Sequence, residues 1–199
     1  APLLLAAGTK AHQKGFDRLV QVFGLLAGRF PDLQLVILGL EPTLYHGVDQ
    51  QLALRALLAD NVAIQSRFHL PGRVGNMIDW YQRAEIFVLP SRYEGFPNVL
   101  LEAMAAGCAC VASDCLTGPA DLIENGRTGL LMPVHASPMD WVETLAALLG
   151  DDERRRSLAA EALEVHERFA EVVLRQSFLK ALAVLPTAEH GGVRNGQDG

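Results

Sequence analysis

Two carboxylates with seven residues between them, Glu94 and Glu102, lie near the middle of the chain. Glu94 lies in a polar loop, whereas Glu102 lies in an Ala- and Leu-rich segment that is typical of a helix. Carboxylates can accept hydrogen bonds from the paired hydroxyl groups of a ribose or another sugar. On the motif alone, the alternative that both are solvated surface residues is equally good.

The loop between the two carboxylates has the features of an anion-binding helix start. Pro97 suits the first helical turn, where its missing N–H loses no partner, and Gly95 lets the backbone approach a ligand closely. The unpaired N–H groups of that turn, with the helix dipole behind them, attract negative charge. A diphosphate fits such a place better than a single carboxylate does.

The elements around this loop form a predicted strand–helix–strand unit. An apolar run at 85–89 precedes the loop, a helix is expected from about Pro97 to Gly107, and a second apolar run follows at 108–113. In such units a ligand lies at the carboxyl ends of the strands, where the helices begin. The segment from Ser91 to Asn98 is therefore expected to carry the function.

The rest of the chain alternates between strand and helix patterns. Further strands are predicted at 3–7, 33–38, 62–64 and 129–132, with 68–70 as another candidate. Helices are predicted at 16–30, 50–59, 77–83 with Asn76 as N-cap, 119–124, from Pro138, from Asp151 and at 170–185. This alternation predicts an α/β fold, a parallel sheet of about six strands with helices on both faces.

A second loop, between Gly8 and Gly15, adds three basic side chains after the first predicted strand. They are Lys10, His12 and Lys14, and the strand order along the chain puts them at a strand's carboxyl end. Taken alone, the lysines are more readily interpreted as solvated surface residues. A contact between His12 and a phosphate is the less favoured of its two interpretations.

Composition excludes several classes of function. The chain has 199 residues and a net charge of −6, which argues against nucleic acid as a partner. No apolar run approaches the length of a membrane span, and no secretory signal is expected at the amino end.

The scattered histidines predict no metal site. The three cysteines, Cys108, Cys110 and Cys115, are expected to be buried free thiols in a reducing cytoplasm.

The central stretch resembles a known signature. The residues that carry the resemblance are Pro90-Ser91, Glu94-Gly95-Phe96 and Leu101-Glu102-Ala103-Met104-Ala105, continued by Gly118-Pro119, Ile123, Gly126, Gly129 and Pro133. This pattern is similar to the donor site of retaining glycosyltransferases of the GT-B fold, in the large family called glycosyl transferases group 1. Within that family it resembles the Rossmann-like C-terminal domain, which binds a nucleotide sugar.

The resemblance implies roles for particular residues. Lys14 and Glu94 would act in catalysis, Glu102 would bind the ribose, Glu94 would bind sugar hydroxyls and Val74 would contact the base. The remaining residues implied in donor binding are Gly95, Phe96, Pro97, Asn98, Leu101, Thr9 and Lys10. The family usually has an arginine where this chain has Thr9, so Lys10 would have to compensate, and a lysine is a point charge without the planar fork of arginine.

The resemblance also implies an organisation and partners. Residues 1–185 would form the donor-binding domain and 186–199 a disordered tail, with an acceptor-binding N-terminal half lacking from this chain. The donor would be a UDP-hexose or UDP-N-acetylhexosamine, the acceptor a glycan or lipid-linked molecule, and transfer would need no metal or other cofactor. The full-length protein would work in the cytoplasm, at the inner face of the membrane through its other half, and the isolated chain would be inactive.

Two alternatives stay open. The first is a module that binds a nucleotide sugar without transferring it, which Thr9 in place of arginine favours. The second is half of a sugar-nucleotide epimerase, which shares the GT-B fold. The frame of residues 101–105 argues against the second alternative.

Overall fold

The computed structural model describes residues 1–42 and 44–170. Its main compact unit is Ala1–Val165, and of the second unit, which begins at His166, it describes only the end of helix α9 (Val165–Arg168) and the two residues after it. The expected helix at 170–185, apart from its first residue, and the expected tail at 186–199 lie outside the described residues.

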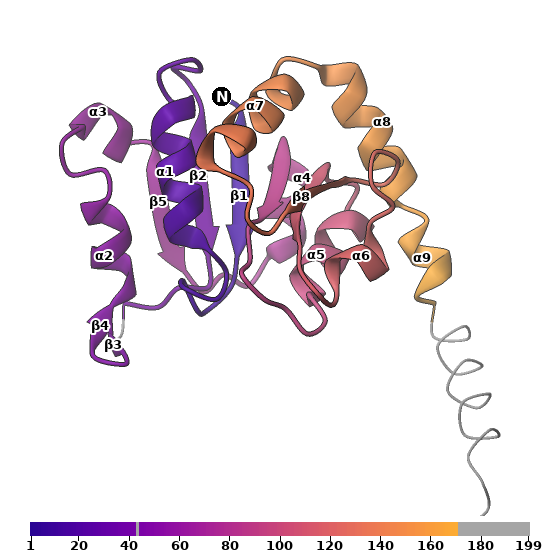
Figure 1. Cartoon of the computed structure of the whole chain (residues 1–199), viewed down its shortest axis with the longest axis horizontal. Coiled ribbons are helices and arrows are strands. Elements are labelled where there is room, and N and C mark those ends of the chain that lie inside the picture. Colours follow the sequence, from indigo (N-terminus) through magenta and orange to yellow (C-terminus); the bar gives the residue numbers. More distant parts are fainter. Residues whose placement is uncertain (43, 171–199) are drawn as a thin grey trace, which may run out of the picture. The chain divides into compact units, whose positions relative to one another are not determined.

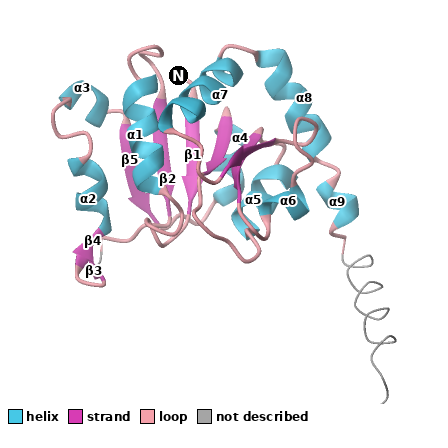
Figure 2. Ribbon diagram, in the orientation of Figure 1, coloured by secondary structure: helices cyan, strands magenta, loops and turns pink. Residues whose placement is uncertain are grey.

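A parallel sheet forms the centre of the main unit (Figures 1 and 2). Its strands are β1 (Leu3–Ala7), β2 (Gln34–Leu38), β5 (Phe68–Gly72), β6 (Ile86–Leu89), β7 (Cys110–Asp114) and β8 (Leu130–Pro133). All pairings are parallel, and β1 and β6, at the centre, are buried along their whole length. Continuous apolar runs suit strands that are covered on both faces, so the predicted fold class is confirmed.

Helices cover both faces of this sheet (Figure 2). In one group of helices, α1 (Phe16–Leu26) packs against α2 (Gln50–Ala56) and α7 (Pro138–Leu149). The other packs α5 (Asn98–Ala105) against α4 (Met77–Arg83), α6 (Pro119–Leu122) and α8 (Asp152–Ala162). The apolar residues of α1 recur at helical spacing, and all of Phe16, Leu19, Val20, Phe23 and Leu26 are buried in the core.

The strand order fixes where a ligand can enter. The order β5-β2-β1-β6-β7-β8 runs outward in both directions from the pair β1 and β6. The connections after these two strands therefore leave toward opposite sides, so the carboxyl ends of β1 and β6 are the switch point of the sheet, where the crevice of an open α/β sheet is expected. The loop after β1 is 8–15 and the loop after β6 is 90–97, the two loops in which the sequence places its candidate residues.

Several elements differ from the sequence prediction. The expected strand at 62–64 is wrong, because Val62–Gln65 forms helix α3, whose start is capped by the Asn61 side chain accepting the Ile64 N–H at 3.1 Å. α1 ends at Leu26 and α2 at Ala56, so both are shorter than predicted.

The segment before α2 forms a small hairpin that the sequence does not reveal. It joins β3 (Leu44–Tyr45) to β4 (Val48–Asp49). Its turn places His46 and Gly47 at φ 49° and 78°, the positive values that a two-residue hairpin turn requires.

Other expectations concern caps, thiols and membrane spans. Asn76 precedes α4 as predicted, but its amide donates to Asp79 (2.8 Å) and its side chain makes no capping bond. The three cysteines are free and buried as predicted, and burial raises the pKa of Cys108 to about 12. Among the described residues no helix is long and apolar enough to cross a membrane, and no cluster of metal-binding side chains is found.

Candidate functional site

The loops after β1 and β6 are joined by an ion pair. Lys14 Nζ, from the first loop, lies 2.7 Å from Oε1 of Glu94 in the second, and the same oxygen accepts the Ser91 hydroxyl at 2.5 Å. The two side chains are only 14% and 4% exposed. Within the described ranges 1–42 and 44–170, Oε2 of Glu94 has no bonded partner, so it can accept a ligand hydroxyl.

Hydrogen bonds and a close backbone approach hold these two loops against each other. The Arg92 N–H donates to Gln13 O at 2.9 Å, and the Arg92 guanidinium donates to both oxygens of Asp17 at 2.7 and 2.6 Å. Gly15 begins α1 with φ 66°, and a Cβ there would lie 2.0 Å from the carbonyl oxygen of Pro90. Only glycine allows this approach, so the loop after β1 packs directly against the end of β6.

The start of α5 is held by the loop after β7. Pro97 occupies the N-cap position, so the helix begins at Asn98, one residue later than predicted. Thr117 donates to the carbonyl oxygen of Glu94 at 2.6 Å. Gly118 lies so close that a Cβ would be 2.5 Å from Gly95 O, at φ 97°. The Asn98 N–H, expected to meet a ligand, donates to Phe96 O at 3.1 Å.

Glu102 lies in the second turn of α5 and has an unexpected partner. Its Oε2 accepts the hydroxyl of Tyr81, from α4, at 2.9 Å. Tyr81 is buried in the core, and its ring lies edge-on to Phe87. Burial, together with the hydrogen bond to Glu102, raises the pKa of Tyr81 well above its ordinary value, so the phenol remains a donor.

The predicted diphosphate residues of the first loop divide into two groups. Lys14 is paired with Glu94, whereas Thr9 and Lys10 are exposed. The loop is held from behind by Gln50, whose buried side chain accepts the Ala11 N–H at 2.7 Å and donates to Thr9 O at 3.3 Å. The sequence gives no sign of Gln50, because it lies 41 residues from Thr9.

The remaining candidates lie at the same edge of the sheet. Val74 is half-buried just after β5, Leu101 is half-buried beside Glu102, and Phe96 is 47% exposed in the loop after β6. His12 is exposed, and its carbonyl oxygen accepts the Arg92 guanidinium at 2.6 Å. The fold therefore brings every sequence-predicted candidate to the carboxyl edge.

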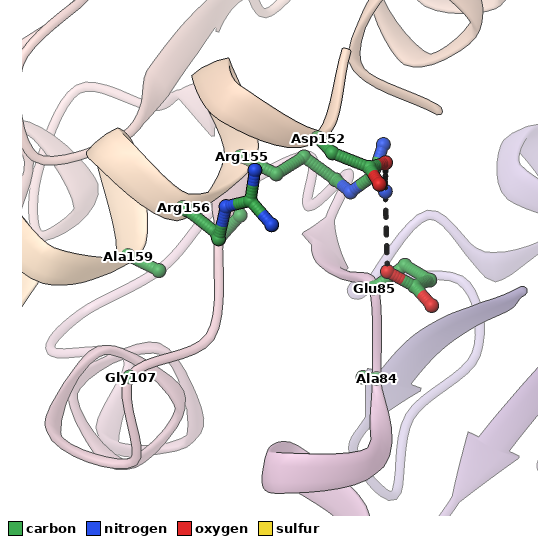
Figure 3. A pocket seen from close by; sticks show the side chains of 8 residues that line it. Ala84, Glu85, Gly107, Asp152, Arg155, Arg156 and Ala159 are labelled. Atoms are coloured by element: carbon green, nitrogen blue, oxygen red, sulfur yellow. Dashed lines mark hydrogen bonds and ion pairs between the residues drawn. The ribbon is translucent and has the colours of Figure 1, made fainter. Parts of the chain in front are cut away.

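A hollow at the opposite edge also contains arginines (Figure 3). It has a volume of about 200 Å³, and Arg155 and Arg156 of α8 line it together with residues that precede β6 and β7. Arg155 is paired with Asp152 and with Glu85, the latter at 3.4 Å. This cluster joins α8 to the start of β6, and its acids offset the arginine charge.

Comparison with known proteins gives the family of the chain. Residues 1–165 match the model of the family described as glycosyl transferases group 1. The chain belongs to this family. Membership accounts for the shared frame around Glu94 and Glu102 at the switch point of the sheet.

Individual relatives span more sequence than this chain does. It is 34% identical over 173 residues to a D-inositol 3-phosphate glycosyltransferase of Xylanimonas cellulosilytica, covering 85% of this chain and 39% of that protein. It is 35% identical over 165 residues to an exopolysaccharide phosphotransferase of Streptomyces coelicolor, covering 82% of this chain but only 17% of the other.

A solved structure shares the fold. The Anabaena protein HepE, crystallised with UDP and glucose, superposes with a TM-score of 0.80 at 19% identity, over 92% of this chain and 48% of its own. This chain thus spans well under two thirds of each of these relatives.

Proposed function

We propose that the chain binds the nucleoside diphosphate sugar of a retaining glycosyltransferase, as its donor-binding half. The observation that carries the proposal is the Lys14–Glu94 pair across the switch-point crevice, beside the start of α5. A cation, a carboxylate and the positive end of the α5 dipole are there together, although the N–H groups of Asn98, Leu100 and Leu101 are already bonded to Phe96 O and Pro97 O. The cation and the dipole suit a diphosphate, and the carboxylate suits a sugar hydroxyl.

The proposed chemistry is transfer without a metal. Glu94 accepts a sugar hydroxyl through Oε2, Glu102 accepts the ribose hydroxyls, and Lys14 turns part of its charge toward the diphosphate. As the bond between sugar and phosphate breaks, negative charge grows on the leaving diphosphate, and donors that are already in place stabilise that charge. The acceptor hydroxyl attacks from the face that the diphosphate leaves and gives its proton to the departing phosphate oxygen. The acceptor is held by a half that lies outside this chain.

UDP is the proposed nucleotide, carrying a hexose or N-acetylhexosamine. The support comes from the relatives, because the crystallised Anabaena protein holds UDP and glucose. A glycan or lipid-linked acceptor, and a place at the inner face of the membrane for the full-length protein, complete the proposal.

A second function, binding without transfer, is favoured by one observation. The position where the family usually has an arginine carries the uncharged Thr9, and Lys14 is already paired with Glu94. The crevice therefore offers a diphosphate less net positive charge than two free cations would.

Two measurements on this chain separate the possibilities. Calorimetric titration with UDP, GDP, ADP and uridine should show binding of a diphosphate, tightest for UDP, and weaker binding of uridine. Long incubation with UDP-glucose or UDP-N-acetylglucosamine should then give no transfer to added acceptors and no product beyond slow hydrolysis, because holding the acceptor is worth many kcal/mol. Detectable hydrolysis favours the transferase half over the binding module, and no binding of any diphosphate refutes both functions.

A further inference from the structure

Tyr81 and Glu102 occupy equivalent positions in two neighbouring helices. Each is the fifth residue of its helix, α4 for Tyr81 and α5 for Glu102, and the two helices pack together. The Tyr81 side chain is buried, with 2% of the residue exposed, whereas Glu102 is exposed. The 2.9 Å hydrogen bond between them therefore runs from the core to the rim of the crevice.

The tyrosine hydroxyl has a fixed position. Its ring lies 5.6 Å from that of Phe87 at an angle of 76°, and Phe87 belongs to the central strand β6. A glutamate on an exposed helix surface otherwise changes rotamer freely, and fixing such a side chain on binding costs free energy. A donor anchored in the core removes most of that cost before a ligand arrives.

The carboxylate retains capacity for a ligand. Oε2 of Glu102 accepts the phenol, and throughout residues 1–42 and 44–170 nothing bonds to Oε1. A carboxylate offers about four acceptor positions, so two neighbouring hydroxyl groups can still be bound.

We propose that Tyr81 is a positioning residue that orients Glu102 toward the two ribose hydroxyls and so makes the chain selective for ribonucleotides. The inference rests on the proposed function, since it requires a nucleotide in the crevice. Tyr81 itself does not touch the ligand. It acts by holding the carboxylate that does.

The test compares nucleotides with and without ribose hydroxyls. UDP and 2′,3′-dideoxyuridine diphosphate are titrated calorimetrically into the unchanged chain, Tyr81→Phe, Glu102→Ala and the double variant. Tyr81→Phe should weaken UDP binding about three- to tenfold, the cost of immobilising one side chain, and leave the dideoxy compound unchanged. In the Glu102→Ala background the same substitution should change neither affinity. Tyr45→Phe, in the β3–β4 hairpin, is the matched control and should change nothing.

A second readout needs no substitution at Tyr81. With ¹³C at the phenol carbon of tyrosine, the signal of Tyr81 should move when UDP binds and move much less with the dideoxy compound. Equal losses for both nucleotides in Tyr81→Phe, or equal signal changes in the unchanged chain, overturn the inference and leave the proposed function standing. Absence of UDP binding to the unchanged chain overturns the proposed function and the inference together.

Discussion

The ion pair across the crevice makes a quantitative prediction for Lys14→Met. Nζ and Oε1 lie 2.7 Å apart, and the side chains are 14% and 4% exposed. The substitution keeps most of the side-chain volume and leaves an almost buried carboxylate whose only remaining side-chain donor, among the described residues, is the Ser91 hydroxyl. Removing one partner of a buried pair costs about 3–5 kcal/mol. Because Ser91 still donates, we expect the free energy of unfolding to fall by about 2–3 kcal/mol.

Urea unfolding of four chains measures this directly. They are the unchanged chain, Lys14→Met, Glu94→Gln and the double variant, compared at equal m-values. The double variant should be more stable than the sum of the single losses implies, by about 1.5–3 kcal/mol, because the neutral amide no longer needs a cation. Lys10→Met, an exposed lysine in the same loop, should change stability by less than about 0.5 kcal/mol. Additive losses would refute the coupling across the crevice.

The other predictions concern binding and pH. Glu102→Gln should weaken UDP binding by about 1.5–3 kcal/mol through loss of a charged hydrogen bond, with the unfolding midpoint little changed; an unaltered calorimetric affinity would contradict the ribose role. Thr9→Arg should strengthen UDP binding by about 1 kcal/mol and leave uridine binding unchanged, because only UDP offers phosphates to a bidentate fork. Burial acts to raise the pKa of Asp17, but hydrogen bonds and charge from Arg92 outweigh it and hold that pKa below its usual value. The stability from this ionised group is therefore present above the unfolded pKa and is lost as pH falls through the folded pKa. In Asp17→Asn the free energy of unfolding should fall less as the pH drops, by about 0.5–1 kcal/mol for a partly exposed pair. The same acid loss in Asp17→Asn and the unchanged chain, measured by denaturation between about pH 5 and pH 2, would contradict this.

The sequence predicts well where local pattern and fold agree. The apolar run at 85–89, the polar loop and the helix after Pro97 are each defined by residues next to one another, so β6 and the loop appear as predicted and α5 begins one residue later. The shared family frame then selects Glu94 and Glu102 from all the carboxylates of the chain. The sheet's order places both loops at one crevice, which the alternation of elements implies but does not specify.

The sequence fails where the decisive contact is distant. Lys14 and Glu94 are 80 residues apart, so their pairing, which changes the charge available to a diphosphate, cannot be inferred from either motif. Tyr81 looks like an ordinary core residue because its helix shows only apolar spacing. Its hydroxyl reaches Glu102 only because α4 packs on α5.

The wrongly predicted strand at 62–64 shows how capping and sheet pairing can override a local strand propensity. Val62 and Ile64 are β-branched and favour a strand, but the Asn61 side chain caps a helical turn there. The neighbouring edge position of the sheet is filled by β5, which pairs with β2 from Phe68 onward. The segment at 62–65 has no strand to join among the described residues, and the helix forms.

An NMR titration of the ¹⁵N-labelled chain with UDP tests the central claim most directly. If the crevice between β1 and β6 holds the donor nucleotide, the amide signals that move should belong to residues 8–15, 91–101 and the start of α4. Amides around Gly107 and Arg155, at the opposite edge, should keep their positions and serve as the internal control. Changes confined to that opposite hollow, or no change at millimolar UDP, would contradict a donor site at the switch point of the sheet.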